Sequence, residues 1–348
     1  MAFDPATGAL KCPACGGTKP VETTGAVVEI PFAGAFRTTD RDNAKIAEDA
    51  LQVTCGGCGA IVEFQPPEVA GACPFCASAI VAQPKSADAH LAPAALLPFH
   101  VQKTHATSLV QEWLGSLWFA PSGLQRLAQQ DAVNGVYLPF FTYDATTLTA
   151  YHGRRGDYYY TTEYFLEADA QGRQVQRQRQ VRHTRWSPCS GKVENNFNDV
   201  LICASRSVQR DKVRDCDPWD LENLVPYEPA FLAGFKAQRY QIELNEGFQV
   251  ATELMAPVID GTIRRDIGGD EQQIGTREVN YFDVTFKHVL LPVWIGAYRF
   301  QGRVFQVIVN GRTGEVQGER PYSFAKIALA VLAVVAIILV LAMLARDR

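Results

Sequence analysis

Three Cys-x-x-Cys pairs carry the clearest chemistry in this sequence, and they use six of its nine cysteines. The pairs Cys55-Gly-Gly-Cys58 and Cys73-Pro-Phe-Cys76 lie close enough that two tight turns joined by a β-hairpin can place four thiolates around one tetrahedral Zn²⁺. A redox dithiol is the alternative, but it would need a thioredoxin-like βαβ context that the sequence lacks. We therefore predict one structural zinc site, in a small β zinc ribbon over residues 51–83.

Cys12-Pro-Ala-Cys15-Gly-Gly is a third turn of this kind, within residues 1–20, and it has no nearby partner pair. The next pair along the chain is already matched within the ribbon, so Cys12 and Cys15 form half of a site. They could bind zinc together with a second chain, or they could remain reduced. A third possibility is that a partner knuckle before Met1 is missing, because residues 3–10 have the composition of the hairpin that normally follows a first knuckle. A second zinc site stays open.

A basic stretch interleaved with glutamines ends at Trp186. On a strand, four of its arginines share one face because side chains alternate: Arg173, Arg177, Arg179 and Arg185. This face could contact anionic lipid headgroups or nucleic acid. The alternative is a solvated strand that faces an acidic hairpin partner, which carries Asp157, Glu163 and Glu167.

The elements that must position these residues follow from hydrophobic patterning. Residues 84–98, rich in Ala and Pro, predict a linker, and residues 98–321 predict one large mixed α+β domain. Helical spacing predicts helices over 104–119 and 246–255. Aromatic and β-branched residues predict strands over the following ranges: 136–143, 157–167, 173–186, 293–300 and 304–309. The predicted fold class is α+β, with an N-terminal ribbon and a C-terminal membrane helix.

The domain contains a faint internal echo. Val136-Tyr-Leu-Pro-Phe-Phe and Val289-Leu-Leu-Pro-Val-Trp share a pattern, and each follows a helical stretch. The echo is consistent with a duplicated helix-plus-strands unit, or with chance.

The membrane prediction rests on an unbroken apolar run at 327–345. A helix over 325–345 would reach about 30 Å, close to the thickness of the hydrocarbon core. Lys326 and Arg346 close its two ends. Because no signal peptide is visible and the thiolates need a reducing compartment, we expect a single-pass, tail-anchored protein of the plasma (inner) membrane with its bulk in the cytoplasm.

Composition and missing motifs narrow the function. The net charge of −4 disfavours a protein whose main role is to bind bare nucleic acid. No Walker A motif, H-E-x-x-H or G-x-S-x-G is present, and Ser190-Gly191-Lys192 is too short a fragment for a phosphate loop. The sequence therefore predicts no enzymatic activity.

Several motifs together resemble a family. They are the Cys55/Cys58 and Cys73/Cys76 ribbon, Trp118-Phe-Ala-Pro121, Gly135-Val-Tyr-Leu-Pro-Phe140, Thr184-Arg-Trp186, Pro218-Trp-Asp-Leu221, Gly268-Gly-Asp270, Phe286-Lys287, Leu291-Pro-Val-Trp294 and Val309-Asn-Gly-Arg-Thr-Gly-Glu-Val316. Over nearly its whole length the chain resembles bacterial TFIIB-type zinc-ribbon membrane proteins, often labelled "primosomal protein N′ (replication factor Y), superfamily II helicase". A helicase needs an ATP site that this sequence lacks. The resemblance implies an adaptor beside flotillin-like (SPFH) or membrane-stress proteins.

Two functional hypotheses follow. The first is a non-catalytic, membrane-held zinc-ribbon adaptor or scaffold with protein partners. The alternative is a membrane-tethered nucleic-acid-binding protein that uses the arginine strand.

Overall fold

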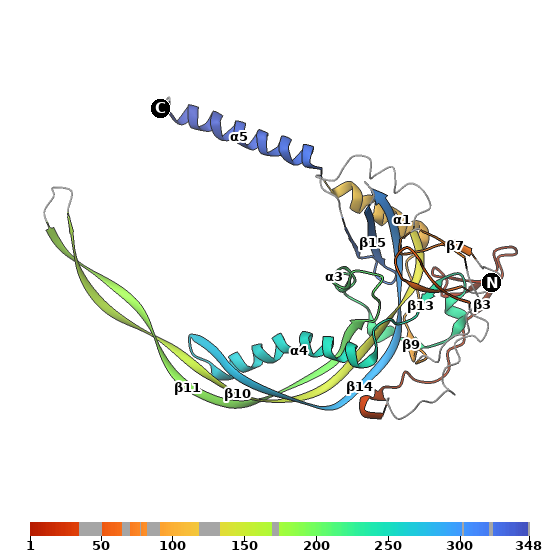
Figure 1. Ribbon diagram of the computed structural model, residues 1–348, viewed down its shortest axis with the longest axis horizontal. Coiled ribbons are helices and arrows are strands. Elements are labelled where there is room, and N and C mark those ends of the chain that lie inside the picture. Colours follow the sequence, from red (N-terminus) through yellow and green to blue (C-terminus); the bar gives the residue numbers. More distant parts are fainter. Residues whose placement is uncertain are drawn as a thin grey trace.

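The computed structural model describes residues 1–34, 51–64, 70–76, 78–81, 91–117, 133–168, 174–300, 303–319 and 323–346. Its frame is a set of three long antiparallel strands: β10 (Val133–Ala168), β11 (Gln174–Cys203) and β14 (Glu271–Phe300). Strand β10 pairs with β11 along one edge and with β14 along the other. The three strands curve away from the body of the molecule as a long arm (Figure 1).

Shorter strands complete an eleven-stranded mixed sheet around this frame. Their order across the sheet is β12-β9-β14-β10-β13-β6-β5, and β15, β16 and β4 attach through β14. The bounds are β4 (Ile30–Pro31), β5 (Leu51–Thr54), β6 (Ile61–Phe64), β9 (Ala95–Leu96), β12 (Val225–Pro226), β13 (Lys236–Gln238), β15 (Arg303–Asn310) and β16 (Val316–Gly318).

Two small sheets lie beside the large one. The first joins β1 (Ala2–Asp4), β2 (Ala9–Lys11) and β3 (Thr18–Pro20), and the second joins β7 (Ala70–Ala72) and β8 (Ala79–Val81).

The longest helix among the described residues, α4 (Leu244–Ile267), lies along the inner face of the arm (Figure 1). It buries Ala251, Met255, Ile259 and Ile263 against the strands, a spacing of four that gives one apolar stripe. The remaining helices are short or peripheral: η1 (Phe32–Gly34), α1 (Lys103–Ser116), α3 (Arg210–Arg214), η3 (Leu221–Asn223), η4 (Pro229–Leu232) and α5 (Phe324–Arg346).

The two echoing segments of the sequence are paired with each other at the centre of the sheet. Val136 lies opposite Val293, and Pro139 lies three residues along, opposite Leu290. Each segment also pairs in parallel with a short strand that precedes the other segment's helix: β13 pairs with β10, and β9 pairs with β14.

The hydrogen bonds repeat as well. Ala204 N–H donates to Pro139 O at 2.9 Å, and Gly311 N–H donates to Pro292 O at 2.8 Å. Gln241 N–H then donates to Ala204 O, just as His100 N–H donates to Gly311 O. The order short strand, helix, long strand, return strand therefore occurs twice, which favours duplication over chance. The second copy of the helix, α4, and the hairpin of the first copy are extended to build the arm.

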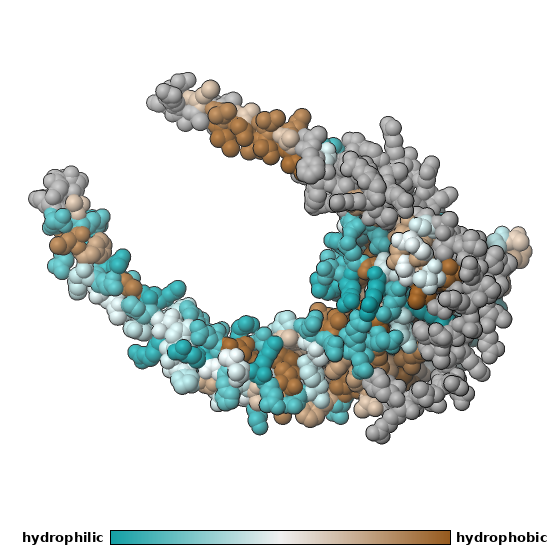
Figure 2. Space-filling model, in the orientation of Figure 1, coloured by the Kyte–Doolittle hydropathy of each residue, from teal (hydrophilic) through white to brown (hydrophobic). Residues whose placement is uncertain are grey.

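Beyond β14 the arm is only two strands wide. Strand β14 begins at Glu271 opposite Gly156, so within the described part of the chain residues 157–168 and 174–185 form strand pairs only with each other. We call this segment the distal ribbon. Its outer part carries exposed aromatic and aliphatic side chains, visible as brown near the end of the arm in Figure 2.

The predicted fold class is wrong in its proportion of helix to strand. The mixed α+β domain expected over 98–321 is dominated by one large sheet with few helices, and strands β5 and β6 of the ribbon belong to that same sheet through the β6–β13 pairing. The error has a physical cause: residues interpreted as breaks between short strands continue one strand of 36 residues, β10. The first part of the predicted linker, 84–90, lies outside the described residues.

The transmembrane prediction is also contradicted. Residues 324–346 do form helix α5, and its large apolar side chains, where described, are exposed (Figure 2). Among the residues that the structure describes, however, no helix combines the length and the apolar character needed to cross a membrane. The single-pass, tail-anchored topology and the inner-membrane location depended on that helix, so they are withdrawn with it.

Candidate metal centre

Two tight turns carry the four cysteines of the ribbon. Cys55 and Cys58 occupy the turn between β5 and β6, while Cys73 and Cys76 occupy the turn after β7. In both turns the first cysteine's N–H closes the loop, donating to Ala60 O at 2.8 Å in one and to Ser78 O at 2.7 Å in the other.

The four Sγ atoms converge. All four lie within 4.8 Å of one another. The Cys55–Cys76 and Cys58–Cys73 Sγ pairs are 3.5 and 3.6 Å apart. Ligands about 2.3 Å from a tetrahedral Zn²⁺ would be about 3.8 Å apart, so zinc fits if these two pairs widen slightly and any sulfurs that lie farther apart move closer. The structure therefore brings together all four predicted ligands as a possible metal-binding site.

Burial disfavours the negatively charged thiolate form of these cysteines when no metal is bound. Cys55, Cys73 and Cys76 are buried and Cys58 is exposed. Desolvation raises the pKa of Cys58, and it raises that of Cys73 to about 11. For Cys76 burial also acts upward, but hydrogen bonds with Ser78 lower the pKa to about 7. A divalent cation would supply the charge that lets all four sulfurs ionise, and four protein ligands leave no open position for catalysis.

The glycines of the first turn have separate roles. Gly59 has φ +74°, a left-handed conformation that side chains rarely adopt. Gly57 instead allows a close approach, because a Cβ there would lie 2.5 Å from Ser78 Oγ and 3.3 Å from Cys76 Sγ. Its N–H lies 3.3 Å from Cys55 Sγ, where it donates to the sulfur.

Gly57→Ala is therefore expected to weaken zinc binding about ten- to a hundredfold, because the added methyl pushes the second turn away from the metal. Competition with a chromophoric chelator measures the affinity. Gly56→Ala is the matched control, since a Cβ at Gly56 meets nothing within 4 Å, and it should bind as the wild type does. Equal affinities for the two variants would contradict the packing argument.

The ribbon is anchored to the body of the protein. Phe75 is fully buried in the core that includes Val136 and Leu138. Gln306 Nε2 donates to Phe75 O at 2.7 Å, and Gln241 Nε2 donates to Gly59 O at 3.3 Å. Both metal-bearing turns thus contact the main sheet, so the metal stabilises an interface as well as a hairpin.

Cys12 and Cys15 lie apart from this site, on the turn between β2 and β3. Cys12 is half-buried and Cys15 is exposed. Among the described residues, no further group of metal ligands includes them. Backbone N–H groups of Cys15 and Ala14 lower the pKa of Cys12.

The arginine strand faces its acidic partner within the distal ribbon. Arg177 bonds Glu167 at 3.0 Å, and Arg179 bonds Glu163 at 2.9 Å. Arg185 lies opposite Asp157 in the pairing register and over the ring of Tyr159. Arg173 lies outside the described residues. Two of the arginines on this face are thus ion-paired with glutamates of the neighbouring strand. Contact of this face with an anionic surface stays a prediction.

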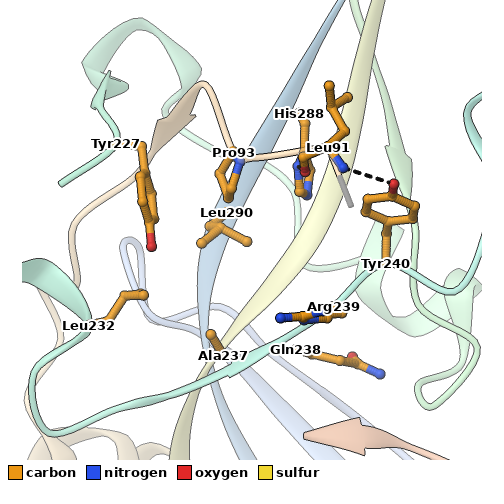
Figure 3. Close-up of a pocket in the computed structure, with 10 residues that line it drawn as sticks. All are labelled: Leu91, Pro93, Tyr227, Leu232, Ala237, Gln238, Arg239, Tyr240, His288 and Leu290. Atoms are coloured by element: carbon orange, nitrogen blue, oxygen red, sulfur yellow. Dashed lines mark hydrogen bonds between the residues drawn. The ribbon is translucent and has the colours of Figure 1, made fainter. Parts of the chain in front are cut away.

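The described part of the chain contains a small cavity and an open hollow. The cavity in Figure 3 has a volume of about 20 Å³, room for about one water molecule, between Pro93, Leu232 and Leu290. At one side of it, Leu91 N–H donates to Tyr240 Oη at 3.1 Å (Figure 3). An open hollow of about 470 Å³ is lined by His100, Pro218, Asp220, Arg312 and Thr313. There, hydrogen bonds from Asn223 and Arg312 lower the pKa of Asp220, and no cysteine or serine nucleophile lines the hollow.

Sequence reasoning missed a buried lysine. Lys287 is 8% exposed and lies 2.7 Å from Asp199, 3.0 Å from Glu29 and 3.9 Å from Asp144. Glu29 directly precedes β4, so the cluster holds the N-terminal segment against β14. Only the pairing of segments far apart in sequence brings these charges together, and no local pattern indicates it.

Comparison with known proteins gives one relative. The chain is 26% identical over 343 residues to "Uncharacterized protein YdjG" of Bacillus subtilis (strain 168), covering 94% of this chain and 89% of that protein. No family model matches the chain. No solved structure matches it either. The alignment spans most of both chains, and the relative's name assigns no activity.

Proposed function

We propose that this protein is a non-catalytic adaptor that is stabilised by zinc at Cys55, Cys58, Cys73 and Cys76 and binds another protein through the distal ribbon. The observation that carries the proposal is the ribbon itself. Residues 159–168 are all exposed, and the two strands there have no third strand or helix against them among the described residues. An isolated two-stranded hairpin is only marginally stable in water, which favours a ribbon that functions when bound.

The two faces of the distal ribbon differ. One carries the ion pairs of Glu163 and Glu167 with their arginines. The other is almost free of charge, and its members alternate along the two strands: Tyr158, Tyr160, Thr162, Tyr164, Leu166, Gln176, Gln178, Gln180, Arg182 and Thr184. Tyr160, Tyr164 and Leu166 are 60, 66 and 68% exposed. Exposed aromatic anchors beside uncharged amides are typical of protein interfaces.

Charge supports a protein partner over nucleic acid. Arg177 and Arg179 are already neutralised by carboxylates on the neighbouring strand. A phosphate backbone would have to compete with those pairs and would be repelled by Glu163 and Glu167. The family resemblance makes flotillin-like (SPFH) proteins the first partners to test.

The test compares two variants of the tagged full chain in pull-downs at several salt concentrations. Tyr160→Ser/Tyr164→Ser/Leu166→Ser is expected to lower retention of a stoichiometric partner at least tenfold, because each lost anchor costs about 1–2 kcal/mol. The control Glu163→Gln/Arg179→Gln removes one ion pair from the opposite face and should change retention less than about twofold. Equal retention by all three proteins, or binding of DNA that falls steeply with salt, would contradict the proposal.

A further inference from the structure

The turn at Cys12 has the backbone of a metal knuckle. Cys12 N–H donates to Gly17 O at 2.9 Å, and Gly16 N–H donates to Cys12 O at 2.9 Å. The turn at Cys55 has the same two bonds: Cys55 N–H to Ala60 O and Gly59 N–H to Cys55 O, both at 2.8 Å. The glycine after the second cysteine is left-handed in both, with φ +73° at Gly16 and +74° at Gly59. The backbone of the Cys12 turn therefore matches that of the Cys55 turn, which belongs to the four-cysteine site.

This knuckle is fixed in place. Phe3 is 4% exposed and packs edge-on against Phe231, with ring centroids 5.2 Å apart. Phe3 N–H also donates to Ala233 O at 2.8 Å, which ties β1 to the body. The β1–β2–β3 sheet holds the turn at its far end, so Cys12 and Cys15 stay apart from the Cys55 site, where four ligands already complete the tetrahedron.

The surroundings of the two sulfurs permit a second copy to approach. Every described residue from 13 to 20 is exposed. The residues beside the cysteines are small: Pro13, Ala14, Gly16 and Gly17. Small, exposed neighbours leave room for a second such turn beside the two sulfurs. Zn²⁺ with four thiolates carries a net charge of about two negative units, and the exposed Lys19 of each copy would offset it, whereas Lys11 is paired with Asp4 at 3.5 Å.

We propose that Cys12 and Cys15 form a zinc half-site that is completed by the same pair of a second copy of this chain, so that one shared ion links two molecules. The geometry supplies two thiolates at knuckle spacing, and zinc requires four ligands in a closed site. A two-fold arrangement supplies the other pair without any further residue type. This inference does not depend on the adaptor function or on the identity of its partner.

Zinc content against protein concentration tests the inference. The full chain in reductant is equilibrated with zinc over a wide range of protein concentrations, and metal content and molar mass are measured together. We expect one zinc per chain at low concentration, rising to three per two chains as molecules of twice the mass form. Protection of Cys12 and Cys15 from iodoacetamide should rise over the same concentrations.

Two variants make the outcomes decisive. Cys12→Ser/Cys15→Ser should keep one zinc per chain at every concentration and lose the zinc-dependent doubling of mass. Cys58→Ser should weaken zinc binding at the ribbon about a hundredfold but keep the concentration-dependent uptake by Cys12 and Cys15. The inference is overturned by two zincs per chain independent of concentration, by free alkylation of Cys12 and Cys15 in zinc, or by a Cys12–Cys15 disulfide in place of metal.

Discussion

Cys58→Ser is expected to weaken zinc binding and to loosen the ribbon while leaving the long strands intact. Structural zinc sites contribute roughly 10–16 kcal/mol in isolated modules. If the four ligands contribute equally to this binding free energy, the loss of one thiolate costs about 3 kcal/mol, which raises the Kd for zinc about a hundredfold. Cys58 is exposed, so the smaller serine side chain leaves no core cavity and the effect isolates the metal.

Hydrogen exchange locates the damage. Amides of 51–64, 70–76 and 78–81 should exchange much faster in Cys58→Ser and in the chelated wild type, because these short strands have little core of their own. Amides of β10 and β14 should remain protected. The same experiment tests the contact with the body, since Gln306 loses its acceptor at Phe75 when the second turn moves.

Cys189→Ser is the matched control. Cys189 is half-buried in β11 opposite Gly153, and it belongs to no cluster of metal ligands among the described residues. It should retain zinc and wild-type exchange in the ribbon. Wild-type zinc affinity in Cys58→Ser would show that Cys58 is not a ligand.

The chemistry of the site was readable from the sequence because its determinants are local. A Cys-x-x-Cys turn fixes two sulfurs within four residues, so Cys55, Cys58, Cys73 and Cys76 could be matched from spacing alone. The same logic found the orphan pair Cys12 and Cys15.

The long strands could not be predicted because their glycines satisfy tertiary contacts. Gly153 and Gly156 interrupt β propensity and suggest turns in the sequence. In the fold, a Cβ at Gly153 would lie 2.5 Å from Gln273 O, and one at Gly156 would lie 2.7 Å from Thr184 Cγ2. These glycines let β14 and β11 pack closely on β10, a requirement that only the folded sheet reveals.

The repeated pattern was detectable in the sequence, but only the strand pairing shows whether it reflects a duplication. Six similar residues around Pro139 and Pro292 do not distinguish duplication from chance. The matching registers of β9 and β13 do, because each short strand meets the residues two and three before the proline of the other unit. The two units have kept the same backbone pairing although little sequence similarity between them remains.

Lys287→Met is expected to destabilise the fold by about 3–5 kcal/mol at neutral pH. The substitution keeps the length of the side chain but leaves Asp144, Asp199 and Glu29 close together with no cation among them. Thermal or urea unfolding of the variant measures the loss. Glu29→Gln is the control: Glu29 is 44% exposed, so removing its partly solvated pair should cost about 1 kcal/mol or less.

The pH dependence distinguishes this electrostatic mechanism from simple loss of packing. In the wild type, desolvation lowers the pKa of Lys287, but ion pairs with Asp199 and Glu29 outweigh it and leave the pKa raised. The hydrogen bond to Lys287 lowers the pKa of Glu29, so the stability from Glu29 is present above its unfolded pKa and is lost as pH falls through the folded one. Burial raises the pKa of Asp144, which acts in the opposite direction: its folded state takes up protons first.

Removing the lysine should reverse the direction in which stability changes with pH. Without the cation, burial and the repulsion between Glu29 and Asp144 raise the pKa values of these two carboxyls, so the folded variant binds more protons than its unfolded chain as the pH falls toward their folded pKa values. The variant should therefore become more stable on acidification toward these values, while the wild type loses the contribution of Glu29. A constant gap between the two stability curves would mean that Lys287 acts only by packing. Convergence of the curves as pH falls would establish that its charge holds the N-terminal segment to β14.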